Sequence, residues 1–325
     1  MADAGARLGP RTVLVLGATG TIGRAVVRAA VARGDLVTAF TRPGSDASAL
    51  GGATVRSGEV TAASLERDVF AGERFDAVVS CLASRTGVPR DAWAVEHDAN
   101  LAALVAAQAA GVAHFVLLSA ICVQRPRLAF QHAKLAFEAK LTASGLRWTI
   151  VRPTAFFKSL SGQVERVRRG KPFLLFGDGR LTACTPIAGD DLAAFILGCI
   201  DDPARWNRIL PIGGPQPAIT PREQGEALFR LLGREAKFRS VPVALLDAIV
   251  DGLSAAGRIV PRLADKAELA RIGRYYATES MLVLDADGRY DAAATPATGA
   301  TTLAAHYARL LAGDAIDDRG DHAVF

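Results

Sequence analysis

Three glycines spaced three residues apart form the chain's most chemically suggestive pattern, Gly17-Ala18-Thr19-Gly20-Thr21-Ile22-Gly23. The pattern follows a short apolar run, Thr12–Gly17, and opens a stretch with helical apolar spacing, Ile22–Arg33. Glycines in such a loop permit a tight turn, close approach of the backbone to a pyrophosphate, and close packing of helix on strand. The free N–H groups of the helix N-terminus favour phosphate. We therefore predict that these seven residues bind a dinucleotide.

The residue after the second expected strand, Leu36–Thr41, selects between the two nicotinamide cofactors. NAD enzymes usually carry an acidic residue there, which holds the ribose 2′-hydroxyl. Here the strand continues into Arg42-Pro43. An arginine can stack on adenine and pair with a 2′-phosphate. Arg42 therefore favours NADPH.

A second group of candidate residues follows the fifth expected strand. Ser119 and Lys134 fall where short-chain dehydrogenases place their serine and lysine. The position four residues before Lys134, where those enzymes carry tyrosine, holds Phe130. A phenyl ring donates no proton, so reduction of a carbonyl through a tyrosinate is not supported. Either the protein binds without catalysis, or the reaction takes its proton from another group.

Two neighbouring side chains could serve as that group. Lys134 can bond a nicotinamide ribose, and it could act as an acid if burial lowered its pKa. His132 titrates in a range suited to proton donation, although a lone histidine is more often structural.

Alternation of short apolar runs with helical segments indicates how these residues are positioned. Buried runs separated by helices are typical of parallel strands with right-handed crossovers. We predict an α/β fold, a Rossmann-type doubly wound parallel sheet with a smaller C-terminal lobe. The expected strands are Thr12–Gly17, Leu36–Thr41, Ala53–Arg56, Asp76–Leu82, His114–Ser119 and Trp148–Arg152, and the expected helices are Ile22–Arg33, Ala92–Ala110 and Gln131–Ser144.

The alternation weakens after Pro153, where prolines divide the chain into short pieces. We predict a cofactor-binding core over residues 11–154 and a smaller substrate-binding lobe over 155–325, with some segments returning to the core sheet. Within the lobe, Thr220-Pro221-Arg222-Glu223 has the pattern of a helix start with a capping box. We expect the charged tail, Asp314–Phe325, to be loosely held.

Composition narrows the class of protein. The chain has 325 residues, 50% of them hydrophobic and 22% charged, with a formal net charge of +5. These values suit a globular α/β protein, and scattered arginines argue against a nucleic-acid partner. The four cysteines form no C-x-x-C pair and the histidines no metal-binding spacing, so we expect reduced thiols and no metal.

No segment has the pattern of a leader or a membrane span. Met1 to Pro10 lacks an apolar core, which predicts a cytoplasmic protein. The apolar stretch from Val241 to Pro261 is interrupted by charges, so we expect it to lie on a membrane surface or to line an apolar pocket. Peripheral contact with a membrane and the oligomeric state stay open.

Longer strings in the second half carry a resemblance to one family. They are 118–124 (LSAICVQ), 129–138 (AFQHAKLAFE), 156–163 (FFKSLSGQ), 176–179 (FGDG), 210–215 (LPIGGP), 275–281 (YYATESM) and 318–322 (DRGDH). With these strings the chain is similar, from about Thr12 to its end, to NADPH-dependent 3,8-divinyl (proto)chlorophyllide 8-vinyl reductases, which are atypical short-chain dehydrogenases. Members of that family also lack the catalytic tyrosine. Plant members carry a transit peptide, so its absence here suits a photosynthetic bacterium.

The resemblance implies hydride transfer from NADPH to the 8-vinyl group of a tetrapyrrole pigment, which becomes 8-ethyl. Charge spreading into the macrocycle would replace the oxyanion stabilisation that a tyrosine provides in carbonyl reduction. The protein must still supply one proton. The candidate donors are Lys134, His132, Tyr275, Tyr276 and water.

The resemblance also completes the expected site. A broad apolar pocket would be lined by Phe156, Phe157, Leu160 and the segment 241–259, while Lys158 and Arg152 could pair with a propionate. Two further interpretations stay open: an NmrA-like NADP(H) sensor without turnover, and an isoflavone-reductase-like enzyme acting on a smaller alkene. The cofactor residues expected beyond the glycine loop are Arg42, Cys81, Ser119, Lys134 and Pro153.

Overall fold

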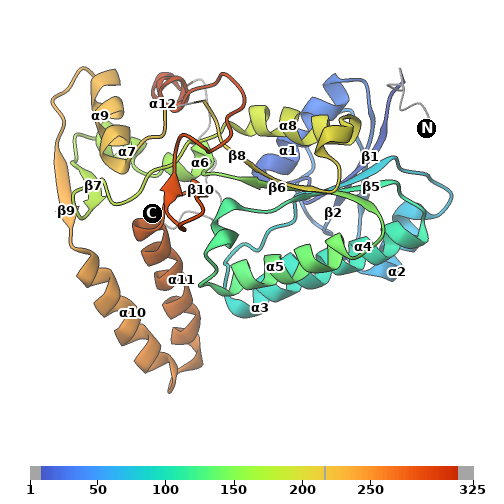
Figure 1. The fold of residues 1–325 in the computed structure, drawn as a ribbon, viewed down its shortest axis with the longest axis horizontal. Helices are drawn as coiled ribbons and strands as arrows, with labels where there is room; N and C mark the ends of the chain where they lie inside the picture. Colours follow the sequence, from blue (N-terminus) through green and yellow to red (C-terminus); the bar gives the residue numbers. More distant parts are fainter. Residues whose placement is uncertain (1–8, 216, 314–325) are drawn as a thin grey trace.

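A parallel seven-stranded sheet forms the centre of the protein (Figure 1). The computed structural model describes residues 9–215 and 217–313. The strand order is β3-β2-β1-β4-β5-β6-β8, so the predicted doubly wound sheet is confirmed. Its strands are β1 (Thr12–Leu16), β2 (Leu36–Thr41), β3 (Thr54–Ser57), β4 (Ala77–Ser80), β5 (His114–Leu118), β6 (Arg147–Pro153) and β8 (Arg208–Ile212).

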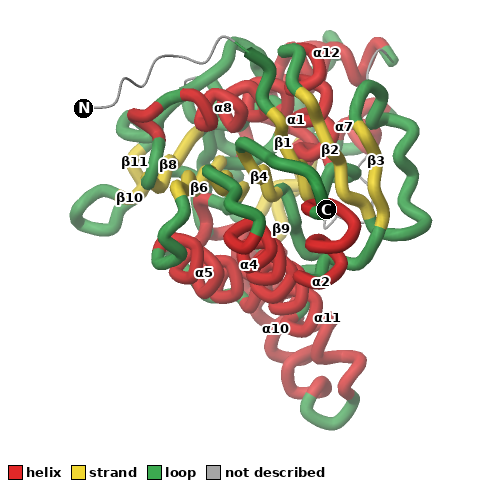
Figure 2. The backbone as a smooth tube through the Cα atoms, turned by 90° about the vertical axis from the view of Figure 1, so that its right-hand side faces the viewer, coloured by secondary structure: helices red, strands yellow, loops and turns green. Residues whose placement is uncertain are grey.

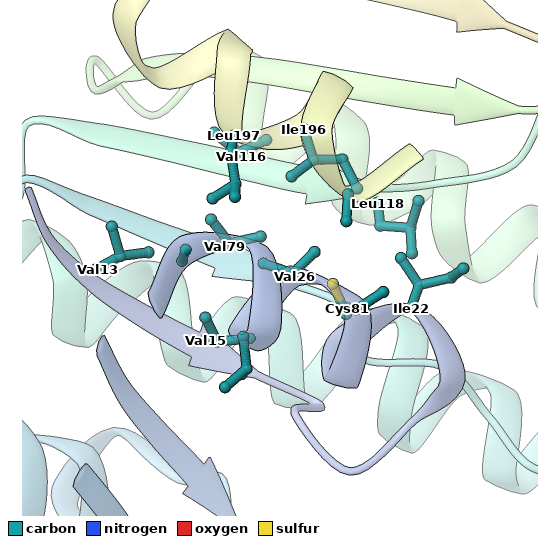
Figure 3. Close-up of a cluster of buried hydrophobic side chains, with 14 of the residues drawn as sticks. Val13, Val15, Ile22, Val26, Val79, Cys81, Val116, Leu118, Ile196 and Leu197 are labelled. Atoms are coloured by element: carbon teal, nitrogen blue, oxygen red, sulfur yellow. The ribbon is translucent and has the colours of Figure 1, made fainter. Parts of the chain in front are cut away.

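Helices cover both faces of this sheet, which is why its central strands are apolar throughout. On one face α1 (Thr21–Ala32) packs beside α8 (Gly189–Asp201), and their apolar side chains join one core cluster with those of the strands. Figure 3 shows part of that cluster, with Val26 of α1 among the strand residues. The other face carries α2 (Ala62–Leu65), the π-helix η1 (Glu66–Phe70), α4 (Asn100–Ala109) and α5 (Ala129–Thr142).

The strand order reverses direction between β1 and β4. From β1 the chain proceeds outward through β2 and β3, then returns to the other side of β1 as β4, β5 and β6. Such a switch point opens a crevice at the carboxyl ends of the two strands, and ligands of open α/β sheets bind there. The predicted glycine loop follows β1 at this point.

One expected helix is more complex than predicted. The segment 92–110 begins at the end of α3 (Pro89–Ala92), passes through a π-helix, η2 (Trp93–Ala99), and only then becomes α4. The Asn100 side-chain amide donates to the carbonyls of Val95 and Glu96, at 3.2 and 3.1 Å. Its carbonyl oxygen accepts from Ser80 Oγ at 2.6 Å. A buried polar bridge to β4 thus accompanies the widened turn, and π-turns of this kind frequently occur at functional sites.

The later half of the chain divides between the core and a second cluster. α8 and β8 return to the core, as described above. A two-stranded sheet of β7 (Phe173–Phe176) and β9 (Phe238–Val241) forms a separate apolar centre with α7 (Val164–Arg168), α9 (Pro221–Leu231) and α12 (Leu303–Ala312). The predicted capping box that opens α9 is confirmed, with Glu223 N–H donating to Thr220 Oγ1.

A helical hairpin projects from this body, as Figures 1 and 2 show. It consists of α10 (Val243–Gly257) and α11 (Pro261–Thr278), followed by the short pair β10 (Val283–Leu284) and β11 (Tyr290–Asp291). None of the described helices is long and apolar enough to cross a membrane. The expectations for the first eight residues, the tail from Asp314 and the string 318–322 fall outside the described residues.

Candidate active site

The glycine loop has the shape that a pyrophosphate cradle requires. Gly17 has a φ of +70°, and a Cβ there would lie 2.5 Å from the Cys81 carbonyl oxygen. A Cβ on Gly23 would lie 2.1 Å from the Gly17 carbonyl oxygen, so neither position tolerates a side chain. A Cβ on Gly20 would meet only the Gly17 oxygen, at 3.3 Å. The loop itself therefore leaves room for a side chain at Gly20. The absence of one there chiefly keeps space open for a ligand outside the loop.

The N-terminus of α1 completes an anion site. Gly20 is its N-cap with no side-chain capping bond, and the first turn carries no acidic residue. The free N–H groups and the helix dipole therefore favour a phosphate. Lys158 Nζ donates to Thr21 Oγ1 at 2.7 Å, which adds a positive charge to this end of the helix. The residues fit a dinucleotide pyrophosphate.

Other predicted cofactor residues lie around the same edge. Arg42 follows β2 with an exposed side chain. The side chains of Ala18 and Ile22 are buried in the core, and so is the Cys81 thiol, drawn beside Ile22 and Val26 in Figure 3. Burial raises the pKa of Cys81 to about 12. These three residues therefore offer a cofactor their main chain rather than their side chains.

Ser119 is fixed by a buried carboxylate. Its hydroxyl donates to Glu138 Oε1 at 2.5 Å, and Glu138 also forms an ion pair with Arg152. The Glu138 side chain is only 4% exposed. Arg152 is thus engaged with a buried carboxylate, and its expected pairing with a substrate propionate stays a prediction.

Lys134 lies on α5 one turn before Glu138 and pairs with a second buried carboxylate, Glu96. Its Nζ lies 2.6 Å from Glu96 Oε2, and the two side chains are 10% and 4% exposed. The other Glu96 oxygen accepts the Ser84 N–H at 3.0 Å. Glu96 belongs to the π-helix η2. The lysine therefore stands at the carboxyl edge of the sheet as half of a buried ion pair, whose disruption would leave an uncompensated charge.

A tyrosine from the projecting hairpin reaches this region. The Tyr276 hydroxyl on α11 lies 4.0 Å from the Cys122 sulfur, while the residue as a whole is 40% exposed. Burial of the hydroxyl raises the pKa of Tyr276 well above its ordinary value, and the nearby Cys122, Tyr275 and Glu96 raise it further. The charge of Lys134 in turn acts on the Cys122 thiol. A protonated phenol thus lies near the Lys134–Glu96 pair, on an element distant in sequence.

The other two candidate proton donors, Tyr275 and His132, do not lie beside the Lys134–Glu96 pair with a free donor group. Tyr275 is 3% exposed, and its hydroxyl donates to the carbonyls of Cys122 and Arg125 at 3.0 and 3.1 Å. His132 has an exposed side chain. Two residues along a helix turn the side chain about 200°, so His132 does not lie with the buried Lys134. The structure brings together Lys134 and Tyr276 but not His132.

The residues expected to line the substrate pocket separate into two kinds. Phe157, at 4% exposure, packs in the second apolar cluster against the His306 ring, so it supports the fold. Phe156 and Leu160 are half-buried, and Pro153 is buried at the end of β6. Of the segment 241–259, most projects with α10. Ser254 and Gly257, in the last turn of α10, line a cavity of about 370 Å³ together with Pro89 and Glu268.

Comparisons with known proteins assign this arrangement to a family. A family model described as NAD(P)H-binding matches residues 17–203. The chain is 50% identical over 332 aligned positions to the chloroplastic divinyl chlorophyllide a 8-vinyl-reductase of Oryza sativa subsp. indica, covering 97% of this chain and 82% of that protein. This chain belongs to the divinyl chlorophyllide a 8-vinyl-reductase family.

Solved structures share the fold of this family member at low identity. Leucoanthocyanidin reductase of Vitis vinifera, in complex with NADPH, superimposes with a TM-score of 0.68 at 18% identity, over 93% of this chain and 99% of that one. The quinone oxidoreductase QOR2 of Escherichia coli, with NADPH, gives 0.66 at 20% identity, over 92% and 99%. The Rossmann-type fold class and the resemblance found in the sequence are both confirmed.

Sequence reasoning missed both buried carboxylates, Glu96 and Glu138. Glu96 lies in a segment predicted as an alanine-rich helix, where a glutamate is typically solvated. Glu138 stands four residues after Lys134, so helical spacing alone could have placed it on the same face. Its burial, however, depends on Ser119 and Arg152, which come from other elements.

Proposed function

We propose that this protein reduces the 8-vinyl group of 3,8-divinyl chlorophyllide a, or of protochlorophyllide a, to 8-ethyl in chlorophyll or bacteriochlorophyll biosynthesis. The observation that carries the proposal is 50% identity over 97% of the chain to a protein of that name. The glycine cradle and the buried site next to it supply the chemistry.

The residues 17–23 would hold the pyrophosphate of NADPH, with Lys158 as an additional phosphate ligand. This moves Lys158 from the substrate side to the cofactor side, because its ammonium lies on Thr21. Arg42 would pair with the 2′-phosphate, and the Ser119 and Lys134 region would face the nicotinamide ribose. NADPH, when bound, supplies the hydride. No acidic side chain in the first turn of α1 opposes this binding.

We assign proton donation to Tyr276. Hydride addition to the terminal vinyl carbon leaves an electron pair that spreads into the macrocycle, and the inner carbon then accepts a proton. Burial makes Tyr276 a weaker acid than a free phenol, so it stays protonated at neutral pH and would give up its proton only to a strong base, such as the carbanion that hydride addition leaves. Donation by Lys134, His132 or water is the alternative outcome of the tests below.

Division of the chain into a cofactor core, 11–154, and a substrate lobe, 155–325, remains part of the proposal. In it Phe156 and Leu160 form part of the apolar wall for the pigment. Both side chains are half-buried, which leaves apolar surface for a ligand. The partner is a small-molecule pigment rather than a nucleic acid, and the location is cytoplasmic with contact to a photosynthetic membrane.

Turnover of the purified protein tests the function directly. With NADPH and divinyl chlorophyllide a, we expect a blue shift of the Soret band that matches NADPH oxidation mole for mole. The matched control is the monovinyl pigment, which already carries the 8-ethyl group and should leave NADPH unchanged. Binding of NADPH without any spectral change would favour the sensor. Reduction only of smaller conjugated alkenes would favour an isoflavone-reductase-like activity.

A further inference from the structure

The outermost helix of the hairpin, α10, is apolar yet has no buried residue. It packs chiefly against α11 and turns its outer face away from the body (Figures 1 and 2). Leu245 is 52% exposed and Ile249 42% exposed. They lie on one helical face, since their spacing is four residues. The exposed uncharged positions of this face, which we call the outer stripe, are Ala244, Leu245, Ala248, Ile249, Gly252 and Ala255.

The polar groups of α10 mostly face the other way. Asp247 forms an ion pair with Arg274 of α11 at 2.7 Å. The Ser254 hydroxyl accepts from Arg271 of α11 at 2.9 Å. Asp251 is exposed at the margin of the outer stripe. The hairpin thus satisfies much of its polarity internally and leaves an apolar surface outside.

The apex of the hairpin extends this apolar surface and adds positive charge. Ile259 is 85% exposed and Val260 45% exposed at the turn between the helices. Arg258 and Arg262 flank them with exposed side chains. Two aliphatic side chains between two arginines, on a projecting tip, can enter the headgroup region of a bilayer while the guanidinium groups reach lipid phosphates.

We propose that the outer stripe and the apex of the hairpin dock the protein on the surface of an anionic phospholipid bilayer. A convex tip suits a deformable lipid surface better than a flat protein interface. The cavity of about 370 Å³ beside the apex, lined in part by Gly257 and Arg258, would then open next to the lipid. Docking goes beyond the proposed reaction, although it would bring an amphiphilic pigment to the proposed site.

Vesicle sedimentation tests the docking without pigment or cofactor, so its result is independent of turnover. We expect the protein to bind vesicles of phosphatidylglycerol and phosphatidylcholine, and to bind pure phosphatidylcholine more weakly. The double variant Ile259→Asp/Val260→Asp should lose binding at least about tenfold, because it puts two charges where apolar side chains enter the lipid. The matched control is Leu36→Asp, an exposed leucine of β2, which should bind like wild type.

Neutralising the arginines separates the contribution of positive charge to vesicle binding from that of the inserted apolar side chains. Arg258→Gln and Arg262→Gln should each weaken binding to anionic vesicles about fivefold, and hardly affect phosphatidylcholine. Equal binding of wild type and Ile259→Asp/Val260→Asp would overturn the proposal. A second result would also overturn it: the wild type is a dimer in sedimentation velocity and does not bind vesicles, and the double variant is a monomer. A second copy of the chain would then cover the outer stripe.

Site-specific labelling gives a direct measure of insertion. The four native cysteines are all buried, so Ile259→Cys would place the reactive thiol at the apex for an environment-sensitive fluorophore. We expect increased, blue-shifted emission when anionic vesicles are added. A label on Leu36→Cys should show no change. Unchanged emission at position 259 would contradict insertion of the apex.

Discussion

The glycine loop and the Lys134 region face the same crevice but are built in opposite ways. The loop is formed by main chain, and the absence of side chains at Gly17 and Gly23 defines its shape. The Lys134 region is formed by side chains from distant elements: Lys134 bonds Glu96 across 38 residues, and Tyr276 meets Cys122 across 154. Substitutions that add a side chain should therefore disrupt the glycine loop, whereas substitutions that remove a bonding partner should disrupt the Lys134 region.

This difference separates binding from chemistry. A cradle of main-chain groups suits a pyrophosphate, which makes the same demands in every dinucleotide enzyme. Proton donation to an alkene needs a particular side chain at a particular place. We propose that the hairpin supplies it through Tyr276, since Phe130 stands in place of the usual tyrosine. Variants in the two regions should therefore fail in different assays.

Gly23→Ala should have the largest effect. Its methyl group would lie 2.1 Å from the Gly17 carbonyl oxygen, so the loop must shift and destabilise the fold by about 3 kcal/mol, as overpacking does. NADPH binding should be lost as well. Gly20→Ala is the matched variant, since its methyl meets only one atom at 3.3 Å. It should weaken NADPH in calorimetry while leaving the melting temperature near that of wild type. Equal melting temperatures for both variants would contradict this account.

Tyr276→Phe should lower kcat by about a hundredfold or more, the usual loss when a general acid is removed. The Kd for NADPH should stay unchanged. Tyr275→Phe provides the comparison, because that hydroxyl bonds two main-chain carbonyls. It should cost about 1 kcal/mol of stability with a smaller effect on kcat. A fully active Tyr276→Phe would assign the proton to Lys134, His132 or water.

Glu96→Gln tests the buried pair through stability. Removing one charge leaves the Lys134 ammonium uncompensated, which typically costs about 3 kcal/mol in the free energy of unfolding. Urea denaturation would measure it. The double variant Glu96→Gln/Lys134→Met should recover much of that loss, since no buried charge remains. A double variant as unstable as the sum of both single variants would show that the two groups act independently.

Arg42→Asp should produce a smaller, selective change. Reversal of charge at the end of β2 is expected to weaken NADPH about tenfold or more while leaving NADH nearly unaffected, as loss of a charge-assisted hydrogen bond to phosphate predicts. Kd values for both cofactors measure the ratio. Equal weakening of both would contradict contact with the 2′-phosphate.

A further contrast concerns alkaline pH, which acts on the buried side chains and leaves the main-chain cradle unionised. Burial raises the pKa of Cys81 and Cys184 to about 12, of Cys199 to about 11 and of Tyr275 to about 12. In the unfolded chain these groups ionise near their ordinary values, about 8.5 for cysteine and about 10 for tyrosine. Above those values the unfolded state releases protons that the folded state keeps, so stability should fall as pH rises from about 9 toward 12. Denaturation midpoints across that range would show it, and a flat profile would contradict it.

The two regions also differ in how far the sequence predicts them. Strand, glycine turn and helix are successive in the chain, so local spacing was sufficient for Gly17, Gly20 and Gly23. The partners of Lys134 depend on tertiary packing that no local pattern encodes. The π-helix η2 illustrates this, because the Asn100 side chain reaches β4 through Ser80. The contact of Lys158 with Thr21, across 137 residues, was likewise beyond spacing rules.

β8, the last strand to join the sheet, has a consequence for engineering. It lies at the edge beside β6, and it comes from residues 208–212, far beyond the cofactor-binding segment. A fragment truncated at residue 154 would leave the N–H and C=O groups of β6 bare along an apolar strand, a template for aggregation. Recombinant fragments or domain chimeras should therefore retain α8 and β8, because the core sheet is complete only with segments from both halves of the chain.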